Sequence, residues 1–199
     1  MELVLATNNL HKVREFKQIV ERIEGVDLLS LRDFSNYDSP EETGKTFEEN
    51  ACLKAESAVG MVGKWVLADD SGLVVPFLKG DPGVYSARYA GENCSDQDNR
   101  EKLLKDLKDA TGDMRAAFFE CCLALKGPNC ELKTVTGVCR GKILEKERGS
   151  GGFGYDPLFV KDGYTKTFAE LDEGTKNKVS HRRKALDKML LILEAIMNK

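Results

Sequence analysis

The chain is poor in the residues and runs that mark several large classes of protein. It has one tryptophan and two histidines among 199 residues, and none of its six cysteines stands in Cys-x-x-Cys spacing. No apolar run approaches the roughly 20 residues that span a bilayer. The N-terminus opens into an apolar stretch, with no basic segment and no cleavage site. We therefore expect no structural zinc site and no membrane anchor, and we expect a cytosolic protein.

The chain also lacks an excess of basic residues. Its formal net charge is −3 at pH 7, whereas a general nucleic-acid binder normally carries a basic surplus. Basic residues do gather near the C-terminus, where they form either a local anion site or the solvated face of a helix. These residues are Lys176, Lys178, Arg182, Arg183, Lys184 and Lys188.

Apolar periodicity predicts an α/β protein. Short apolar runs at 3–6, 26–31, 65–68, 116–125 and 132–139 predict strands, and the last two predict a hairpin. Helical spacing predicts a first helix that begins after Thr7 to Asn9 and is closed by Gly25, and a second that begins at Thr46 or Gly44. It also predicts helices from 97 to 107 and from 179 to 197. We expect a mixed central β-sheet flanked by helices, in a single domain over residues 1–199 that is bent into two lobes.

Glycine is concentrated in one segment. Four glycines fall within residues 149–154, followed by Tyr155 and Asp156, with Phe153 among them. Absent side chains let a backbone lie close against a ligand, and the two aromatic faces and the carboxylate suit a flat ring with a charged tail. The alternative is a flexible turn.

A second candidate site lies where the first strand passes into the first helix. Thr7, Asn8 and Asn9 precede Lys12 there. Helix N-termini present unpaired N–H donors that favour phosphate, and Lys12 would add a full charge. Ordinary capping by Thr7 or Asn8 is the equally weighted alternative.

A third candidate site is the acidic segment Asp69-Asp70-Ser71-Gly72, which we place just past a strand end. Two adjacent carboxylates diverge from an extended backbone, so one would bind metal or activate water while its neighbour supports the turn. Glu41 and Glu42 would supply a further oxygen ligand, and an oxygen-only set suits Mg²⁺. The alternative is a simple turn.

The fourth candidate is Ser180-His181-Arg182 at a helix start, preceded by Lys176. Adjacent side chains diverge, so a Ser–His nucleophilic pair is disfavoured. A basic helix start opposes the helix dipole, which favours an anionic partner over a face turned to solvent.

Taken together, these segments resemble the inosine triphosphate pyrophosphatase family. The resemblance rests on motifs in the same order along nearly the whole chain, with Ser150 as a mild departure where Thr is frequent. The motifs are Thr7-x-Asn9-x-x-Lys12, Glu41-Glu42-Thr43-Gly44, Thr46 to Ala51 with Lys54, Ala68 to Leu73, Pro82 to Tyr89, Gly151 to Pro157 and Ser180-His181-Arg182.

The resemblance implies an elongated fold with the active-site cleft between two lobes, a homodimer, and Mg²⁺-dependent hydrolysis of ITP, dITP and XTP to the monophosphate and pyrophosphate. Such an enzyme removes deaminated purines from the nucleotide pool. Asp70 would be the proton acceptor and, with Glu41, a metal ligand. Thr7, Asn8, Asn9, Lys12 and Lys54 would grip the triphosphate. The nucleoside would meet Ser71, Phe153, Gly154, Tyr155, Asp156, Lys176, His181 and Arg182.

Two alternatives stay open. One is a pyrophosphatase for other modified nucleotides, and the other is a non-catalytic nucleotide sensor. Base choice would rest on the six-position carbonyl of hypoxanthine and xanthine, because donors aimed at it stay unpaired against adenine. Guanine shares that carbonyl, and no residue is assigned to its rejection.

Overall fold

The structure, a computed structural model, describes residues 1–7, 9–20, 25–34, 37 and 39–198. It contains a six-stranded sheet in the order β2-β1-β3-β4-β5-β6. β1 is parallel to both β2 and β3, whereas β5 and β6 are antiparallel, so the sheet is mixed as expected. The strands are β1 (Glu2–Ala6), β2 (Asp27–Ser30), β3 (Trp65–Val74), β4 (Ala116–Lys126), β5 (Lys133–Ile143) and β6 (Phe159–Lys161).

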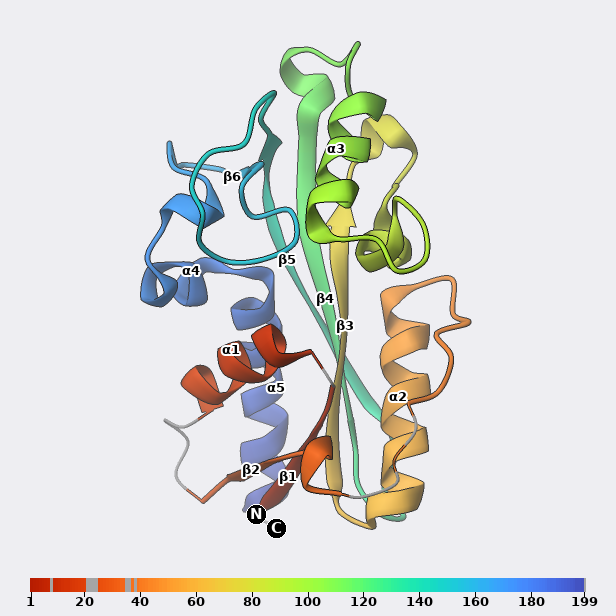
Figure 1. Ribbon diagram of the computed structural model, residues 1–199. Helices are drawn as coiled ribbons and strands as arrows, with labels where there is room; N and C mark the ends of the chain where they lie inside the picture. The colour runs from red at the N-terminus through yellow and green to blue at the C-terminus, as the bar shows by residue number, and fades with distance from the viewer. Residues whose placement is uncertain (8, 21–24, 35–36, 38, 199) are drawn as a thin grey trace. The chain divides into compact units, whose positions relative to one another are not determined.

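Five α-helices lie in the described part of the chain (Figure 1): α1 (Leu10–Val20), α2 (Phe47–Val62), α3 (Asp96–Asp106), α4 (Glu173–Val179) and α5 (His181–Met197). None of them combines the length and apolar character that a membrane crossing requires. The chain divides into two compact units. Unit 1 contains residues 1–70, 121–137 and 182–199, and unit 2 contains residues 71–120 and 138–181.

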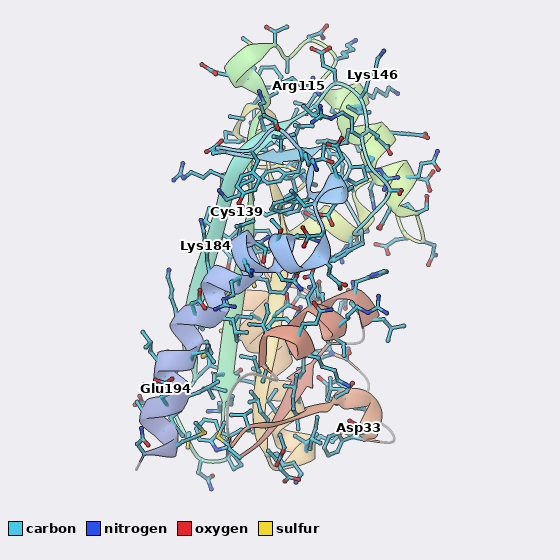
Figure 2. The ribbon with its side chains drawn as sticks, turned by 90° about the vertical axis from the view of Figure 1, so that its left-hand side faces the viewer. Asp33, Arg115, Cys139, Lys146, Lys184 and Glu194 are labelled. Atoms are coloured by element: carbon cyan, nitrogen blue, oxygen red, sulfur yellow. The ribbon has the colours of Figure 1, made fainter. Side chains whose placement is uncertain are left out.

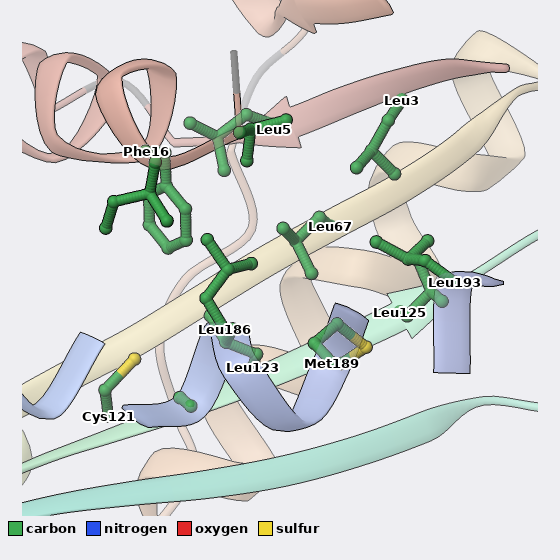
Figure 3. Packing of buried hydrophobic residues seen from close by; sticks show 13 residues of the cluster. Leu3, Leu5, Phe16, Leu67, Cys121, Leu123, Leu125, Leu186, Met189 and Leu193 are labelled. Carbon is green, nitrogen blue, oxygen red and sulfur yellow. The ribbon is translucent and has the colours of Figure 1, made fainter. Parts of the chain in front are cut away.

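Unit 1 contains β1, β2 and the first part of β3. Alternate residues of β1 and β3, among them Leu5 and Leu67, face α1 and α5 and form a buried apolar cluster with Phe16, Leu186 and residues of β4. Figure 3 shows side chains from all five elements meeting in this cluster. α2 covers the opposite face, where it buries Phe47 and three alanines. The two faces of β3 are therefore covered by different helices.

Unit 2 has its own apolar cluster, formed by residues of α3, β4, β5 and the segment after the glycine-rich run. Arg115, labelled in Figure 2, is buried beside it. Its guanidinium donates to the carbonyls of Leu107, Ile143 and Leu144 at 2.9, 2.8 and 2.7 Å. These bonds tie the end of α3 to the end of β5, and they satisfy carbonyl groups that would otherwise lie unpaired near the core.

Two predicted boundaries are wrong. β3 continues through Asp69 and Asp70 to Val74, so these residues lie inside the strand and not past its end. The last helix does not begin at Val179: extended backbone at Ser180 separates α4 from α5. The hairpin prediction agrees with β4 and β5, which follow one another and are neighbours in the sheet. Ile23, the last apolar residue of the predicted first helix, lies outside the described residues.

Candidate functional site

The start of α1 is capped by Asn9. Its Oδ1 accepts hydrogen bonds from the backbone N–H groups of His11 and Lys12 at 3.0 and 3.3 Å, and Thr7 Oγ1 accepts one from the N–H of Asn9 at 3.2 Å. The cap is therefore Asn9 and not Thr7, and the predicted alternative Asn8 lies outside the described residues. Because Asn9 occupies two helix N–H groups, the cationic side chain of Lys12 is the main positive group of this segment.

Strand alternation separates the two adjacent aspartates of β3. Asp69 shares the face of Leu67 and points toward α1 and α5, whereas Asp70 points toward α2. β1 ends at Ala6, whose partner in β3 is Ala68. Asp69 therefore stands just beyond the carboxyl end of β1, beside the start of α1. The predicted divergence of the two carboxylates is confirmed.

Asp69 is the centre of a buried ionic cluster. Its carboxylate lies 3.0 Å from Lys12 Nζ and 3.6 Å from Arg182 Nε, and its side chain is fully buried. Arg182 also forms an ion pair with Glu15 of α1. Burial alone would raise the pKa of Asp69, but Lys12, Arg182 and Lys54 outweigh it and hold that pKa far below the ordinary range. Asp69 therefore stays ionised and fixes two cations beside β1.

Asp70 is held by α2. Lys54 Nζ lies 3.1 Å from Asp70 Oδ1, and Asn50 Nδ2 donates to Asp70 Oδ2 at 3.1 Å. Lys54 also contacts Glu42 at 3.1 Å, and the N–H of Gly44 donates to Asn50 Oδ1 at 2.8 Å. A Cβ on Gly44 would come within 2.5 Å of that oxygen, so the glycine permits this contact. Asn50 and Lys54 thus join the 41–44 loop to Asp70.

Burial has the largest influence on the pKa of Asp70, and two basic and two acidic side chains also act on it. Burial raises the pKa of Asp70; Lys54 and Lys12 lower it, Glu42 and Asp69 raise it, and the result lies above the ordinary value. Burial lowers the pKa of Lys54, but Asp70, Asp69 and Glu42 raise it above its ordinary value. A carboxylate with a raised pKa is a stronger base than an ordinary aspartate.

The structure brings Glu42, and not Glu41, against Lys54; the Glu41 side chain is exposed. Among the residues that the structure describes, no three carboxylate, imidazole or thiol side chains converge in a ready-made metal cage. Mg²⁺ does not need one, since it is commonly held by one or two carboxylates, waters and substrate phosphates. Glu42 and Asp70 share Lys54, so the donor set at this end of α2 fits such an ion.

The glycine-rich segment packs mainly against its own chain. An added Cβ would approach backbone atoms of Ala169 to 2.6 Å at Gly149 and 3.0 Å at Gly151, and Asp156 Oδ2 to 2.1 Å at Gly152. The close approach inferred from the sequence is therefore internal at these three positions. Two peptide N–H groups of the segment also donate hydrogen bonds within the chain. The N–H of Gly151 donates to the carbonyl of Ala169, and the N–H of Phe153 donates to the carboxylate of Asp156.

Within unit 2, Lys176 links the glycine-rich segment to two aromatic rings. Its Nζ lies 2.6 Å from Asp156 Oδ2 and 4.8 Å from the centre of the Phe153 ring, and the lysine is 5% exposed. Phe153 is half-buried, whereas Tyr155 is buried in the apolar cluster and its hydroxyl donates to the Ser86 carbonyl at 2.9 Å. Of the two predicted stacking rings, Phe153 is the accessible one.

His181 stands at the first position of α5 and is buried. Its ring stacks on Phe119, with centroids 4.8 Å apart and planes at 15°. Phe119 in turn stacks on Phe168, whose ring lies 5.9 Å from Lys176 Nζ. Aromatic contacts therefore connect His181 to the Lys176–Asp156 pair. Ser71 is half-buried in β3 of the same unit.

The predicted residues thus fall into two groups. Unit 1 holds Thr7, Asn9, Lys12, Glu41, Lys54, Asp70 and Arg182, and unit 2 holds Ser71, Phe153, Gly154, Tyr155, Asp156, Lys176 and His181. The site predictions missed Glu15, Asn50, Phe119 and Phe168. A sequence signal existed for Glu15, because it stands four residues before Ile19 and so shares the buried face of α1.

Comparisons with known proteins identify the family of this chain. The sequence profile of the Ham1 family matches residues 3–192. The chain is 52% identical over 195 residues to the dITP/XTP pyrophosphatase of Protochlamydia amoebophila, and 51% identical over 194 residues to that of Bacillus subtilis. Each comparison covers 98% of this chain and 98% of the relative.

Solved structures give the same result. The Staphylococcus aureus Ham1 protein superposes with a TM-score of 0.87 at 44% identity, and the Coxiella burnetii HAM1 protein with 0.89 at 39% identity. Each comparison covers 98% of this chain and 99% of the other. The family resemblance of the sequence motifs is therefore confirmed, and the chain belongs to the Ham1 family.

Proposed function

We propose that this protein hydrolyses ITP, dITP and XTP to the nucleoside monophosphate and pyrophosphate, and so clears deaminated purines from the nucleotide pool. The observation that carries the proposal is the acidic pair of β3, with Asp69 fixing cations on one face and Asp70 lying beside Lys54 on the other. The names of the relatives, dITP/XTP pyrophosphatase, support it.

Asp70 has the properties of a general base. Its raised pKa strengthens it as a proton acceptor, and the bonds from Asn50 and Lys54 fix its direction. In the proposed reaction Asp70 takes a proton from the water that attacks the α-phosphorus. Lys12 and Lys54 neutralise negative charge that develops on the departing pyrophosphate, with Thr7 and Asn9 placed at the same end of α1.

Mg²⁺ is the proposed cofactor. When bound, it would neutralise phosphate charge and favour in-line displacement. Asp70 is the proposed protein ligand, together with a carboxylate of the 41–44 loop. We keep Glu41 as the candidate from the family motif and add Glu42, since Glu42 shares Lys54 with Asp70.

The nucleoside is assigned to unit 2. Phe153 offers an accessible ring, and the nearly buried ammonium of Lys176 and the imidazole of His181 offer donors suited to a base carbonyl. Arg182 was expected to contact the nucleoside. We propose that it contacts the triphosphate, because Asp69 and Glu15 hold it in unit 1.

Both units belong to one catalytic domain in this proposal, with the active-site cleft between two lobes of an elongated fold. We also propose that the protein acts as a homodimer. The support for these points is the family membership and the division of the predicted residues between the two units.

The test is a substrate panel. Purified protein is incubated with Mg²⁺ and ITP, dITP, XTP, ATP or GTP, and pyrophosphate release is measured. We expect turnover of the first three at least ten times faster than of ATP and GTP, and loss of turnover when a chelator is added. Preference for a modified pyrimidine triphosphate would redirect the proposal to another pyrophosphatase. Tight ITP binding without turnover would support the non-catalytic sensor.

A further inference from the structure

The glycine-rich segment forms a loop whose two ends are joined by backbone hydrogen bonds, and we call these joined ends the base of the loop. The backbone N–H of Leu144 donates to the carbonyl of Leu158 at 2.8 Å, and that of Arg148 donates to the carbonyl of Pro157 at 2.9 Å. Residues 149–156 leave from this base and return to it. The peptide around Gly154 lies within the loop, between Phe153 and Asp156, so its orientation affects the direction of both side chains.

Packing does not fix this peptide. Gly154 has φ +58°, and an added Cβ would meet nothing within 4 Å. Two side chains of α3 hold it instead. Asp96 Oδ2 accepts a hydrogen bond from the N–H of Gly154 at 2.6 Å, and Arg100 Nη1 donates to its carbonyl at 3.0 Å. Both polar groups of one residue are thus held from the same helix.

Arg100 also reaches the base of the loop. Its Nε lies 2.9 Å from Glu147 Oε1, and its side chain is 15% exposed. The guanidinium therefore bridges the chain entering the loop and the peptide within it. The guanidinium makes the hydrogen bond through Nη1 and the ion pair through Nε, and the single ammonium of a lysine reproduces two such contacts poorly.

α3 is a firm support for these contacts. Ser95 and Asp98 form a capping box at its start, and Leu103 buries its other end in the apolar cluster of unit 2. Asp96 and Arg100 are four residues apart and so lie on the same face of the helix. Both project to the glycine-rich loop from a helix start that is itself well ordered by its cap.

We propose that Asp96 and Arg100 are positioning residues for nucleoside binding. They hold the Gly154 peptide so that the ring of Phe153 and the carboxylate of Asp156, which fixes Lys176, keep the arrangement that a purine nucleoside requires. This inference rests on the proposed function, because it assigns the 153–156 segment to the nucleoside. Neither side chain touches the reacting phosphate in this proposal.

The test compares four variants with the wild type. Asp96→Ala and Arg100→Met remove the contacts, whereas Asp96→Asn keeps an oxygen acceptor and Arg100→Lys keeps a charge. We expect KM for ITP to rise about tenfold in the first two, the size expected for a lost charge-assisted hydrogen bond. kcat should change less than about twofold, since Asp70 is untouched. Asp96→Asn should recover most of the loss and Arg100→Lys only part of it.

Gln97→Ala is the matched control, because Gln97 donates to Glu101 within α3. Its KM should stay at the wild-type value. Hydrogen exchange of peptides covering residues 149–157 gives a readout independent of turnover, and it should speed up in Asp96→Ala and Arg100→Met but not in Gln97→Ala. The dissociation constant of inosine monophosphate, which also needs no turnover, should rise in parallel with KM.

The outcomes separate this inference from the proposed function. The inference would be overturned if Asp96→Ala and Arg100→Met left the hydrogen exchange of residues 149–157 unchanged. It would also be overturned if they left the affinity for inosine monophosphate unchanged. An equal loss in Gln97→Ala would overturn it too, because it would point to general weakening of α3. A wild type that hydrolyses no purine triphosphate would refute the proposed function alone, while exchange and monophosphate binding would still decide the role of Asp96 and Arg100.

Discussion

Replacing Asp70 by asparagine is expected to lower kcat for ITP about a thousandfold, within the range for loss of a general base. Asparagine keeps the shape of the side chain and can still accept from Asn50, but it cannot take a proton from water. The free energy of unfolding should change by less than about 1 kcal/mol. The change is small because ionisation of Asp70 costs free energy in the folded protein, as its raised pKa indicates, and because Lys54 keeps Glu42 as a partner.

Steady-state kinetics and urea denaturation of the same preparation measure both effects. The control is Asp187→Asn, which removes a half-exposed carboxylate that pairs with Arg183 on α5. That variant should keep wild-type kcat. An Asp70→Asn protein that is folded and fully active would show that another group accepts the proton.

Replacing Asp69 by asparagine is expected to lower the free energy of unfolding by about 3 kcal/mol, as for other buried ion pairs that lose one partner. The carboxylate is fully buried between Lys12 and Arg182. The amide would leave Lys12 without its partner and would remove one of the two carboxylates around Arg182. The surrounding cations lower the pKa of Asp69, so its ionised form stabilises the fold at neutral pH.

Urea denaturation at pH 7 measures this loss, and the Asp70→Asn variant is the internal comparison. The two substitutions make the same chemical change at adjacent positions of one strand. We therefore expect a large loss of stability at Asp69 and a large loss of kcat at Asp70. Equal effects on stability at both positions would contradict the distinction between the two faces of β3.

Much of the fold could be predicted because apolar periodicity reports burial directly. The strand at 3–6 and the second helix follow from it, and of the two predicted starts, Thr46 and Gly44, Thr46 is the observed N-cap of α2. β3 was predicted too short for a physical reason. Two consecutive aspartates disfavour a strand unless cations neutralise them, and Lys12, Arg182 and Lys54 come from distant segments.

The sequence predicted residue types for the candidate site but not their pairing with one another. The motifs named Lys12, Lys54 and Asp70, but nothing in the sequence showed that Asp69 fixes Lys12 or that Asn50 directs Asp70. Such partners are set by tertiary packing between elements far apart in the chain.

The glycine run shows the same limit. Its lack of side chains indicated a close approach, and the sequence could not tell an external ligand from Ala169 and Asp156 of the same chain.

The central claim is that the linkage between the α- and β-phosphates is broken, so that ITP gives the monophosphate and pyrophosphate. It is tested most directly by incubating the wild-type protein with ITP and Mg²⁺ and separating the products by anion-exchange chromatography. Our account predicts inosine monophosphate and pyrophosphate in equal amounts from the first turnovers. Inosine diphosphate with inorganic phosphate would contradict it.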